Sequence, residues 1–130
     1  MNTTGPILEL GCGDYSTPAL LSIAKAQGRK YLGQCSNDGW ARQFENVEFV
    51  KWDTWEPPKE KWGMVFIDSD EPTWIRVKRI PQFKDLTDVI VLHDADISMK
   101  RDGWNSAIEC FPNVVLYTKH VPWTAVMRKC

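Results

Sequence analysis

The sequence of 130 residues lacks long hydrophobic runs and lacks an excess of charge of either sign. Its apolar runs fall well short of the roughly 18 residues that suggest a membrane-spanning helix, and the first residues form neither a basic nor an apolar leader. We therefore expect no membrane partner and a cytoplasmic location. The formal net charge of −1 gives no reason to expect a nucleic acid partner, because binding to a phosphate backbone needs clustered cations. A small-molecule substrate is expected, and the oligomeric state stays open.

Cysteine is also scarce. The residues Cys12, Cys35, Cys110 and Cys130 are scattered, without the close pairs of a zinc site or a dense disulfide framework. We interpret them as reduced thiols, mostly buried. The composition is 43% hydrophobic and 25% charged, as in ordinary globular proteins. Residues 1–130 are predicted to form a single domain, which needs no disulfide or metal for stability.

Short apolar runs rich in β-branched residues predict buried parallel strands at 7–10, 30–35, 47–51, 63–67 and 89–92. Helices are predicted between them: one capped by Ser16 or Thr17 and ended by Gly28, one at 38–44 and one around 73–80. Residues 114–119 and 124–128 are too close in sequence for a crossover helix, so they must form an antiparallel hairpin. The pattern predicts a three-layer α/β fold, with helices on both faces of a mostly parallel sheet.

The turn after the first strand is the main chemical signal. It leads into a helix and reads Glu9-Leu10-Gly11-Cys12-Gly13-Asp14-Tyr15-Ser16. Gly11 and Gly13 allow a tight turn and close approach of a ligand, and the helix N-terminus offers free N–H groups. The turn resembles the first motif of class I S-adenosylmethionine-dependent methyltransferases. The alternative is a strand-to-helix turn whose glycines serve packing only.

Later parts of the chain extend this resemblance. The fourth and fifth predicted strands end in Ile67-Asp68 and His93-Asp94, which resemble the Ile-Asp and His-Asp strand ends of small Rossmann-like methyltransferases. The terminal hairpin resembles the reversed last strand of that family. The resemblance implies a methyltransferase-type sheet with S-adenosylmethionine as cofactor. Since the first strand begins six residues after Met1, the N-terminal helices of related enzymes are expected to be missing.

The resemblance also implies a set of cofactor-binding residues at the strand ends. They are Glu9, Gly11, Cys12, Gly13, Tyr15, Ser16, Cys35, Ser36, Asn37, Asp53, Thr54, Trp55 and Asp68. Tyr15 stands where the family often has a third glycine. Cys35 stands where it usually has an acid that binds both ribose hydroxyls, and its absence predicts weak affinity because hydrogen bonds to charged acceptors are stronger. Trp55 would stack on adenine, or simply pack in the core.

The candidate catalytic residues are Asp68, His93 and Asp94, because open α/β sheets bind ligands at the carboxyl ends of their strands. A hydroxyl acceptor needs a base or a metal ion, and the tetrapeptide of amino-group methyltransferases is absent, so we expect an oxygen of a small molecule or sugar. Asp68 and Asp94 would bind Mg²⁺ or another divalent cation, with Asp96 or Asp70 as third ligand, or would form a carboxylate pair. The alternative for His93 is to hold its turn together.

Other interpretations stay open. The chain could be a non-catalytic or binding-impaired methyltransferase-like domain. It could also be a nucleotide-sugar-binding Rossmann-like enzyme that uses the same glycine turn for a diphosphate, although that reading predicts a sheet without the terminal hairpin. The basic run Arg76, Lys78 and Arg79 is predicted to form a solvated helix face.

Overall fold

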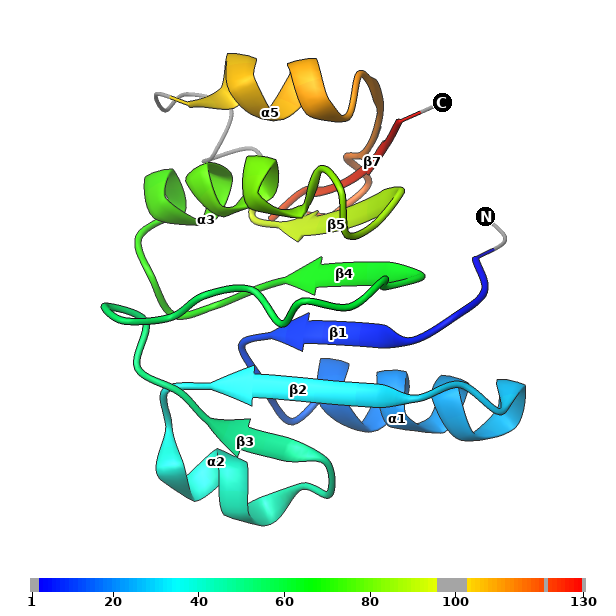
Figure 1. The fold of residues 1–130 in the computed structure, drawn as a ribbon, viewed down its shortest axis with the longest axis vertical. Coiled ribbons are helices and arrows are strands. Elements are labelled where there is room, and N and C mark those ends of the chain that lie inside the picture. Colours follow the sequence, from blue (N-terminus) through cyan, green and yellow to red (C-terminus); the bar gives the residue numbers. More distant parts are fainter. Residues whose placement is uncertain (1–2, 96–102, 121, 130) are drawn as a thin grey trace.

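The computed structural model describes residues 3–95, 103–120 and 122–129 (Figure 1). Its elements are, in chain order, β1 (Ile7–Leu10), α1 (Ser16–Gln27), β2 (Tyr31–Cys35), α2 (Asp38–Gln43), β3 (Val47–Phe49), β4 (Met64–Ile67), α3 (Thr73–Arg79), the 3-10 helix η1 (Ile80–Phe83), β5 (Val89–His93), α5 (Trp104–Cys110), β6 (Asn113–Tyr117) and β7 (Thr124–Arg128). Among these residues no helix has the length and apolar character needed to cross a bilayer.

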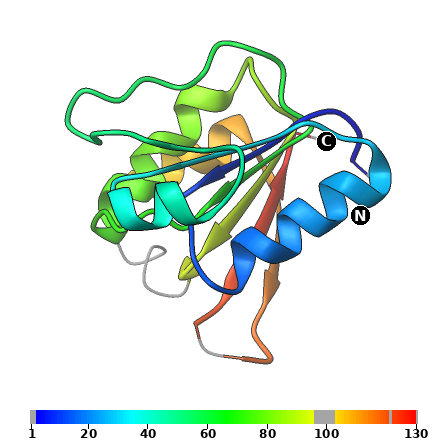
Figure 2. The ribbon, with the colours of Figure 1, turned by 90° about the horizontal axis from the view of Figure 1, so that it is seen from below.

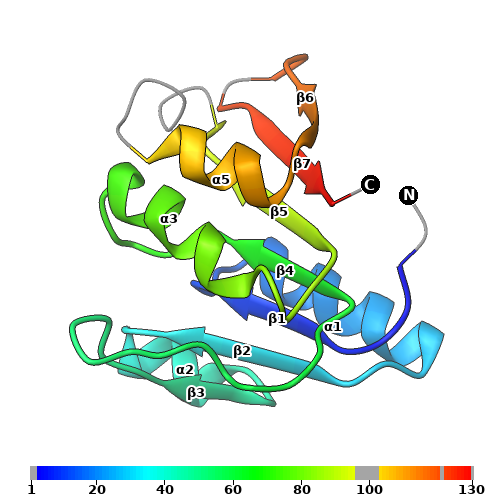
Figure 3. The same ribbon diagram turned by 45° about the horizontal axis from the view of Figure 1, so that its top comes forward.

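Within the described residues, the strands form a 7-stranded sheet in the order β3-β2-β1-β4-β5-β7-β6. Strands β1 to β5 pair in parallel wherever they are neighbours. Strand β7 runs antiparallel to both β5 and β6 and lies between them. Figure 3 labels these three strands at one end of the sheet. The predicted mostly parallel sheet with a C-terminal antiparallel hairpin is therefore confirmed.

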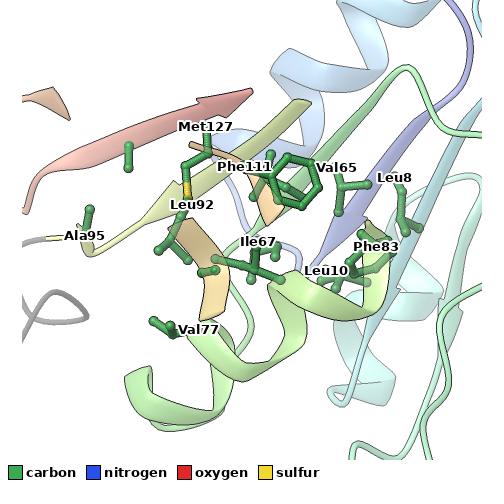
Figure 4. Close-up of a cluster of buried hydrophobic side chains, with 14 of the residues drawn as sticks. Leu8, Leu10, Val65, Ile67, Val77, Phe83, Leu92, Ala95, Phe111 and Met127 are labelled. Carbon is green, nitrogen blue, oxygen red and sulfur yellow. The ribbon is translucent and has the colours of Figure 1, made fainter. Parts of the chain in front are cut away.

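Helices cover both faces of the sheet, and Figure 2 shows α1 on one side with α3 and α5 on the other. Under α3, η1 and α5 lies the larger core cluster, which includes Leu8, Ile67, Phe83 and Phe111 (Figure 4). Helix α1 packs on the opposite face through Leu20 and Ala24. All residues of β1 are buried, as expected for a central parallel strand with helices on both sides.

The ends of the helices show where the sequence signals hold. Helix α1 stops at Gly28, which adopts the left-handed conformation with φ 63°, as predicted. Its start differs, because Tyr15 holds the N-cap position without a side-chain hydrogen bond. The Thr17 hydroxyl instead accepts a hydrogen bond from the Gly13 N–H at 3.0 Å. Helix α5, which no sequence signal indicated, begins after Gly103 without a side-chain cap.

Candidate functional site

The glycine turn after β1 is shaped by the chain's own backbone. Gly11 has φ +86°, and a Cβ atom there would lie 2.1 Å from the carbonyl oxygen of Asp68. Only glycine therefore allows the loop after β4 to cross the end of β1. At Gly13 a Cβ atom would meet nothing within 4 Å, so the start of α1 faces open space. The two glycines thus serve different purposes.

Glu9 lies beneath this turn and ties three elements together. Its side chain is fully buried, with 0% exposure, and accepts hydrogen bonds from the Thr17 hydroxyl at 2.7 Å and the Tyr31 hydroxyl at 2.5 Å. Burial raises the pKa of Glu9, although hydrogen bonds from Ser16, Tyr31 and Thr17 oppose the rise. Glu9 therefore supports the turn from below, between β1, α1 and β2.

A hollow of about 350 Å³ opens at the carboxyl ends of β1, β2 and β4. Its lining comprises Gly11, Cys12, Cys35, Ser36, Asn37, Trp40, Asp68, Asp70 and Arg76. In Figure 1 the arrowheads of β1, β2 and β4 point to the same edge of the sheet, which is where open α/β sheets bind ligands. Other hollows, of about 380 and 720 Å³, lie beside residues 3–6, at the opposite edge. Topology therefore favours the hollow at the carboxyl edge as the site.

The sequence prediction and this lining agree in part. Of the predicted cofactor-binding residues, those that line the hollow are Gly11, Cys12, Cys35, Ser36, Asn37 and Asp68. Tyr15 is 93% exposed and lies outside the lining. The lining adds Trp40, Asp70 and Arg76, none of which was predicted to bind the cofactor.

The segment 53–55 is not brought into the hollow. Asp53 and Thr54 are exposed, while Trp55 is buried with 7% exposure. The Trp55 indole N–H donates to the Gln34 side-chain oxygen at 2.7 Å, and its ring packs against Phe83. Trp55 is therefore a core residue, and its ring is not available to stack on a ligand in this conformation.

The ends of β4 and β5 bring the predicted catalytic residues together. The Nδ1 atom of His93 lies 3.3 Å from one carboxylate oxygen of Asp68 and 3.3 Å from one of Asp94. Asp94 has φ 61°, a left-handed conformation that aspartate tolerates better than most residues. Burial raises the pKa of Asp68, and the Asp94 carboxylate adds to the rise, whereas His93 and Arg76 oppose it.

Arg76 of α3 completes this cluster, and it corrects the prediction of a solvated helix face. Its guanidinium Nη1 lies 2.6 Å from Asp94 Oδ2 and 3.4 Å from Asp68 Oδ1, and Arg76 is only 9% exposed. Arg79 also turns inward, where it pairs with Glu71 at 2.7 Å. Of the basic run, only Lys78 is exposed.

Asp68, His93 and Asp94 offer ligand atoms that all lie within 4.8 Å of one another. They nevertheless do not fit Mg²⁺, because the Arg76 guanidinium already lies against both carboxylates and would repel a second cation. Mg²⁺ also prefers oxygen ligands to an imidazole nitrogen. The predicted third ligand Asp96 lies outside the described residues. The predicted divalent cation is therefore not supported, and the positive charge beside the carboxylates comes from Arg76.

The sequence matches no protein-family model and no curated protein. Solved structures do match. A methyltransferase from Pyrococcus furiosus has a TM-score of 0.60 at 16% identity, over 95% of this chain and 74% of that chain. A TehB-like SAM-dependent methyltransferase from Corynebacterium glutamicum has a TM-score of 0.61 at 12% identity, over 100% of this chain and 83% of that one. PKMT2 from Rickettsia typhi, in complex with AdoHcy, has a TM-score of 0.52 at 14% identity, over 70% of this chain. The matched region is 21% of the PKMT2 chain.

The sheet order differs from that of a dinucleotide-binding sheet. A dinucleotide-binding sheet places six strands in the order 3-2-1-4-5-6, whereas here the reversed β7 lies between β5 and β6. At these low identities the likeness is one of fold. The resemblance seen in the sequence is thus confirmed at that level: the chain has the Rossmann-like fold of the class I methyltransferases.

Proposed function

We propose that this chain binds S-adenosylmethionine, and its product S-adenosylhomocysteine, in the hollow at the carboxyl edge of the sheet. The observation that carries the proposal is the position of that hollow against the Gly11 turn, beside the open space at Gly13. Its volume of about 350 Å³ falls within the usual range for small-molecule sites. The AdoHcy complex of PKMT2, a protein of similar fold, adds support.

The ligand would lie across the end of β1. Its amino-acid part would face Gly11, Cys12 and the start of α1, where free N–H groups favour a carboxylate. Its nucleoside would extend toward Ser36 and Trp40 at the end of β2 and the start of α2. Trp40, rather than the buried Trp55, is the aromatic residue in the lining.

The proposed reaction is methyl transfer to an oxygen of a small molecule or sugar. The acceptor oxygen forms a bond to the methyl carbon, the bond from that carbon to the sulfonium sulfur breaks, and the ligand leaves as a thioether. His93 would accept the hydroxyl proton, and Asp68 and Asp94 would orient and stabilise the resulting imidazolium. Arg76 balances the charge of the two carboxylates, so the proposal includes no metal ion.

Calorimetric titration with S-adenosylhomocysteine tests the binding proposal, with NAD as the control ligand. We expect S-adenosylhomocysteine to bind and NAD not to bind. No response to millimolar S-adenosylhomocysteine in titration or in thermal unfolding would overturn the assignment. Binding of NAD or a nucleotide sugar instead would support the alternative of a nucleotide-sugar-binding enzyme.

Transfer to a panel of catechol and sugar hydroxyls tests the reaction. We expect His93→Gln to lower kcat by about 100-fold or more while leaving the affinity for S-adenosylhomocysteine within about twofold. A chelator should have no effect. Binding without transfer to any acceptor would instead favour a non-catalytic methyltransferase-like domain, and full activity of His93→Gln would remove this residue from the mechanism.

A further inference from the structure

The end of β2 offers no free carboxylate to a ligand. Cys35 is 4% exposed, and its thiol donates to the carbonyl oxygen of Asn37 at 3.3 Å. The side chain of Asn37 caps α2 by accepting a hydrogen bond from the Trp40 N–H. Asp38 pairs with Arg42 at 2.7 Å on the surface of the same helix. From Cys35 to Asp38, every side chain that could receive a ribose hydroxyl is therefore neutral or already paired.

A carboxylate reaches this place from another strand. Asp70, in the loop between β4 and α3, accepts the hydrogen of the Ser36 hydroxyl, whose oxygen lies 2.9 Å from Oδ1 and 2.7 Å from Oδ2. The Trp52 indole N–H donates to Asp70 Oδ1 at 2.8 Å. Asp70 and Ser36 both line the hollow. The Asp70 carboxylate is thus held beside the end of β2 by donors from two other loops.

The close approach at Gly11 explains how Asp70 arrives there. Strand β1 separates β4 from β2 in the sheet, so the loop after β4 must cross the end of β1 to reach Ser36. A Cβ atom on Gly11 would lie 2.1 Å from the Asp68 oxygen and 2.6 Å from the Ser69 Cα, which shows that the crossing passes directly over the glycine. Ser69, next to Asp70, is 1% exposed, so the loop is fixed at this point.

We propose that Asp70 is the residue that binds the ribose hydroxyls of the S-adenosyl ligand, in place of the acid that β2 lacks. This inference rests on the proposed function. An ionised carboxylate offers about four acceptor positions, and the two donors Ser36 and Trp52 leave room on Oδ2 for further hydrogen bonds. Such charge-assisted bonds are stronger than those that Cys35 or Asn37 could supply.

The test compares two ligands on three proteins. The ligands are S-adenosylhomocysteine and its analogue with a 2′-deoxyribose. The proteins are the unmodified chain, Asp70→Asn, and Asp88→Asn as a matched control, since Asp88 is an exposed aspartate beside the hollow at the opposite edge. Asparagine keeps an acceptor for Trp52, and thermal unfolding checks that Asp70→Asn keeps its fold.

We expect Asp70→Asn to weaken S-adenosylhomocysteine binding by about 10- to 100-fold, and Asp88→Asn to change it less than twofold. The unmodified chain should bind the 2′-deoxy analogue more weakly than S-adenosylhomocysteine. The loss of affinity caused by Asp70→Asn should be clearly smaller for the 2′-deoxy analogue than for S-adenosylhomocysteine.

Three results would overturn the inference. Equal affinity of Asp70→Asn and the unmodified chain for S-adenosylhomocysteine would exclude Asp70 from ribose binding and leave the proposed function intact. Equal losses for both ligands would mean that Asp70 acts only through the shape of the loop. Absence of binding to the unmodified chain would overturn the proposed function and this inference together.

Discussion

Replacing Arg76 by methionine is the most informative change to the cluster at the ends of β4 and β5. Methionine keeps an unbranched apolar chain in the space beneath α3 but removes the guanidinium. The Arg76 side chain is 11% exposed, and its partners Asp94 and Asp68 are 21% and 32% exposed. The variant therefore removes the positive charge of Arg76 from beside two partly buried carboxylates that lie near each other.

The expected loss of stability follows from this partial burial. Removing one partner of a fully buried ion pair costs about 3–5 kcal/mol, and water reaches both carboxylates here, so we expect about 2–3 kcal/mol at pH 7. With an unfolding entropy of about 2.1 cal/mol/K per residue, a chain of this length should lose about 7–11 °C in Tm. Lys84→Met, a change of an exposed cation after η1, should stay within about 0.5 kcal/mol.

The pH dependence separates lost charge balance from lost packing. Burial already raises the pKa of Asp68, with Arg76 opposing the rise, so removing Arg76 should raise this pKa further. A raised pKa in the folded state lowers stability as pH rises above the unfolded value. The deficit of Arg76→Met should therefore be largest near pH 7 and shrink toward pH 4, as measured by urea denaturation. A deficit below about 1 kcal/mol, or one that does not change with pH, would refute this reasoning.

The turn after β1 gives three further predictions. Burial raises the pKa of Glu9 in the folded state, so this residue should add to the free energy of unfolding when the pH is lowered from 7 to 5. In Glu9→Gln, the free energy of unfolding measured by denaturation should therefore rise less over that interval than it does in the unmodified chain. Gly11→Ala should lower the free energy of unfolding by several kcal/mol, and Tm with it, since its Cβ would meet the Asp68 carbonyl. An unchanged Tm would contradict the close passage of the loop after β4 over Gly11. Gly13→Ala should keep Tm within about 2 °C, because its Cβ enters open space, yet weaken S-adenosylhomocysteine binding measured by calorimetry; unchanged binding would place the ligand elsewhere.

The fold could be predicted from the sequence because its signals are local. Strand β1 has apolar residues at three of its four positions, and this short apolar run is visible without knowing which elements lie beside it. The Gly28 stop and the short segment between β6 and β7 are equally local. Helix α5 lacks such a signal, since its N-cap residue Gly103 makes no side-chain hydrogen bond and the helix itself has only 7 residues. Its stability comes from burying Ala107 and packing against α3 and η1, which a sequence does not display.

The candidate site depends on contacts between distant segments, and these contacts decide between the alternatives that the sequence leaves open. The basic run predicted a solvated position for Arg76, but its guanidinium lies against the carboxylates of Asp68 and Asp94. Trp55 was a candidate for adenine because of its position after the third strand, yet the buried Gln34 side chain provides an acceptor for its indole N–H within the core. Each outcome depends on a polar partner that lies on a different element.

The position of Cys35 also depends on a contact between segments that are distant in sequence. Judged from the sequence, Cys35 at the position of the family's acid predicts weak affinity, because sequence position alone does not show which carboxylates of other elements lie beside it. In the structure the relevant neighbour is Asp70, 34 positions from Ser36 in sequence and joined to it by hydrogen bonds. The loop that carries Asp70 to Ser36 passes over Gly11, where only glycine leaves room for it. The glycine turn and the position of Asp70 therefore depend on each other. An acid at the Cys35 position would place a second negative charge near Asp70. We therefore expect Cys35→Glu to improve S-adenosylhomocysteine binding only when Asp70 is also replaced by asparagine. Tighter binding by Cys35→Glu alone would show that the two positions act independently.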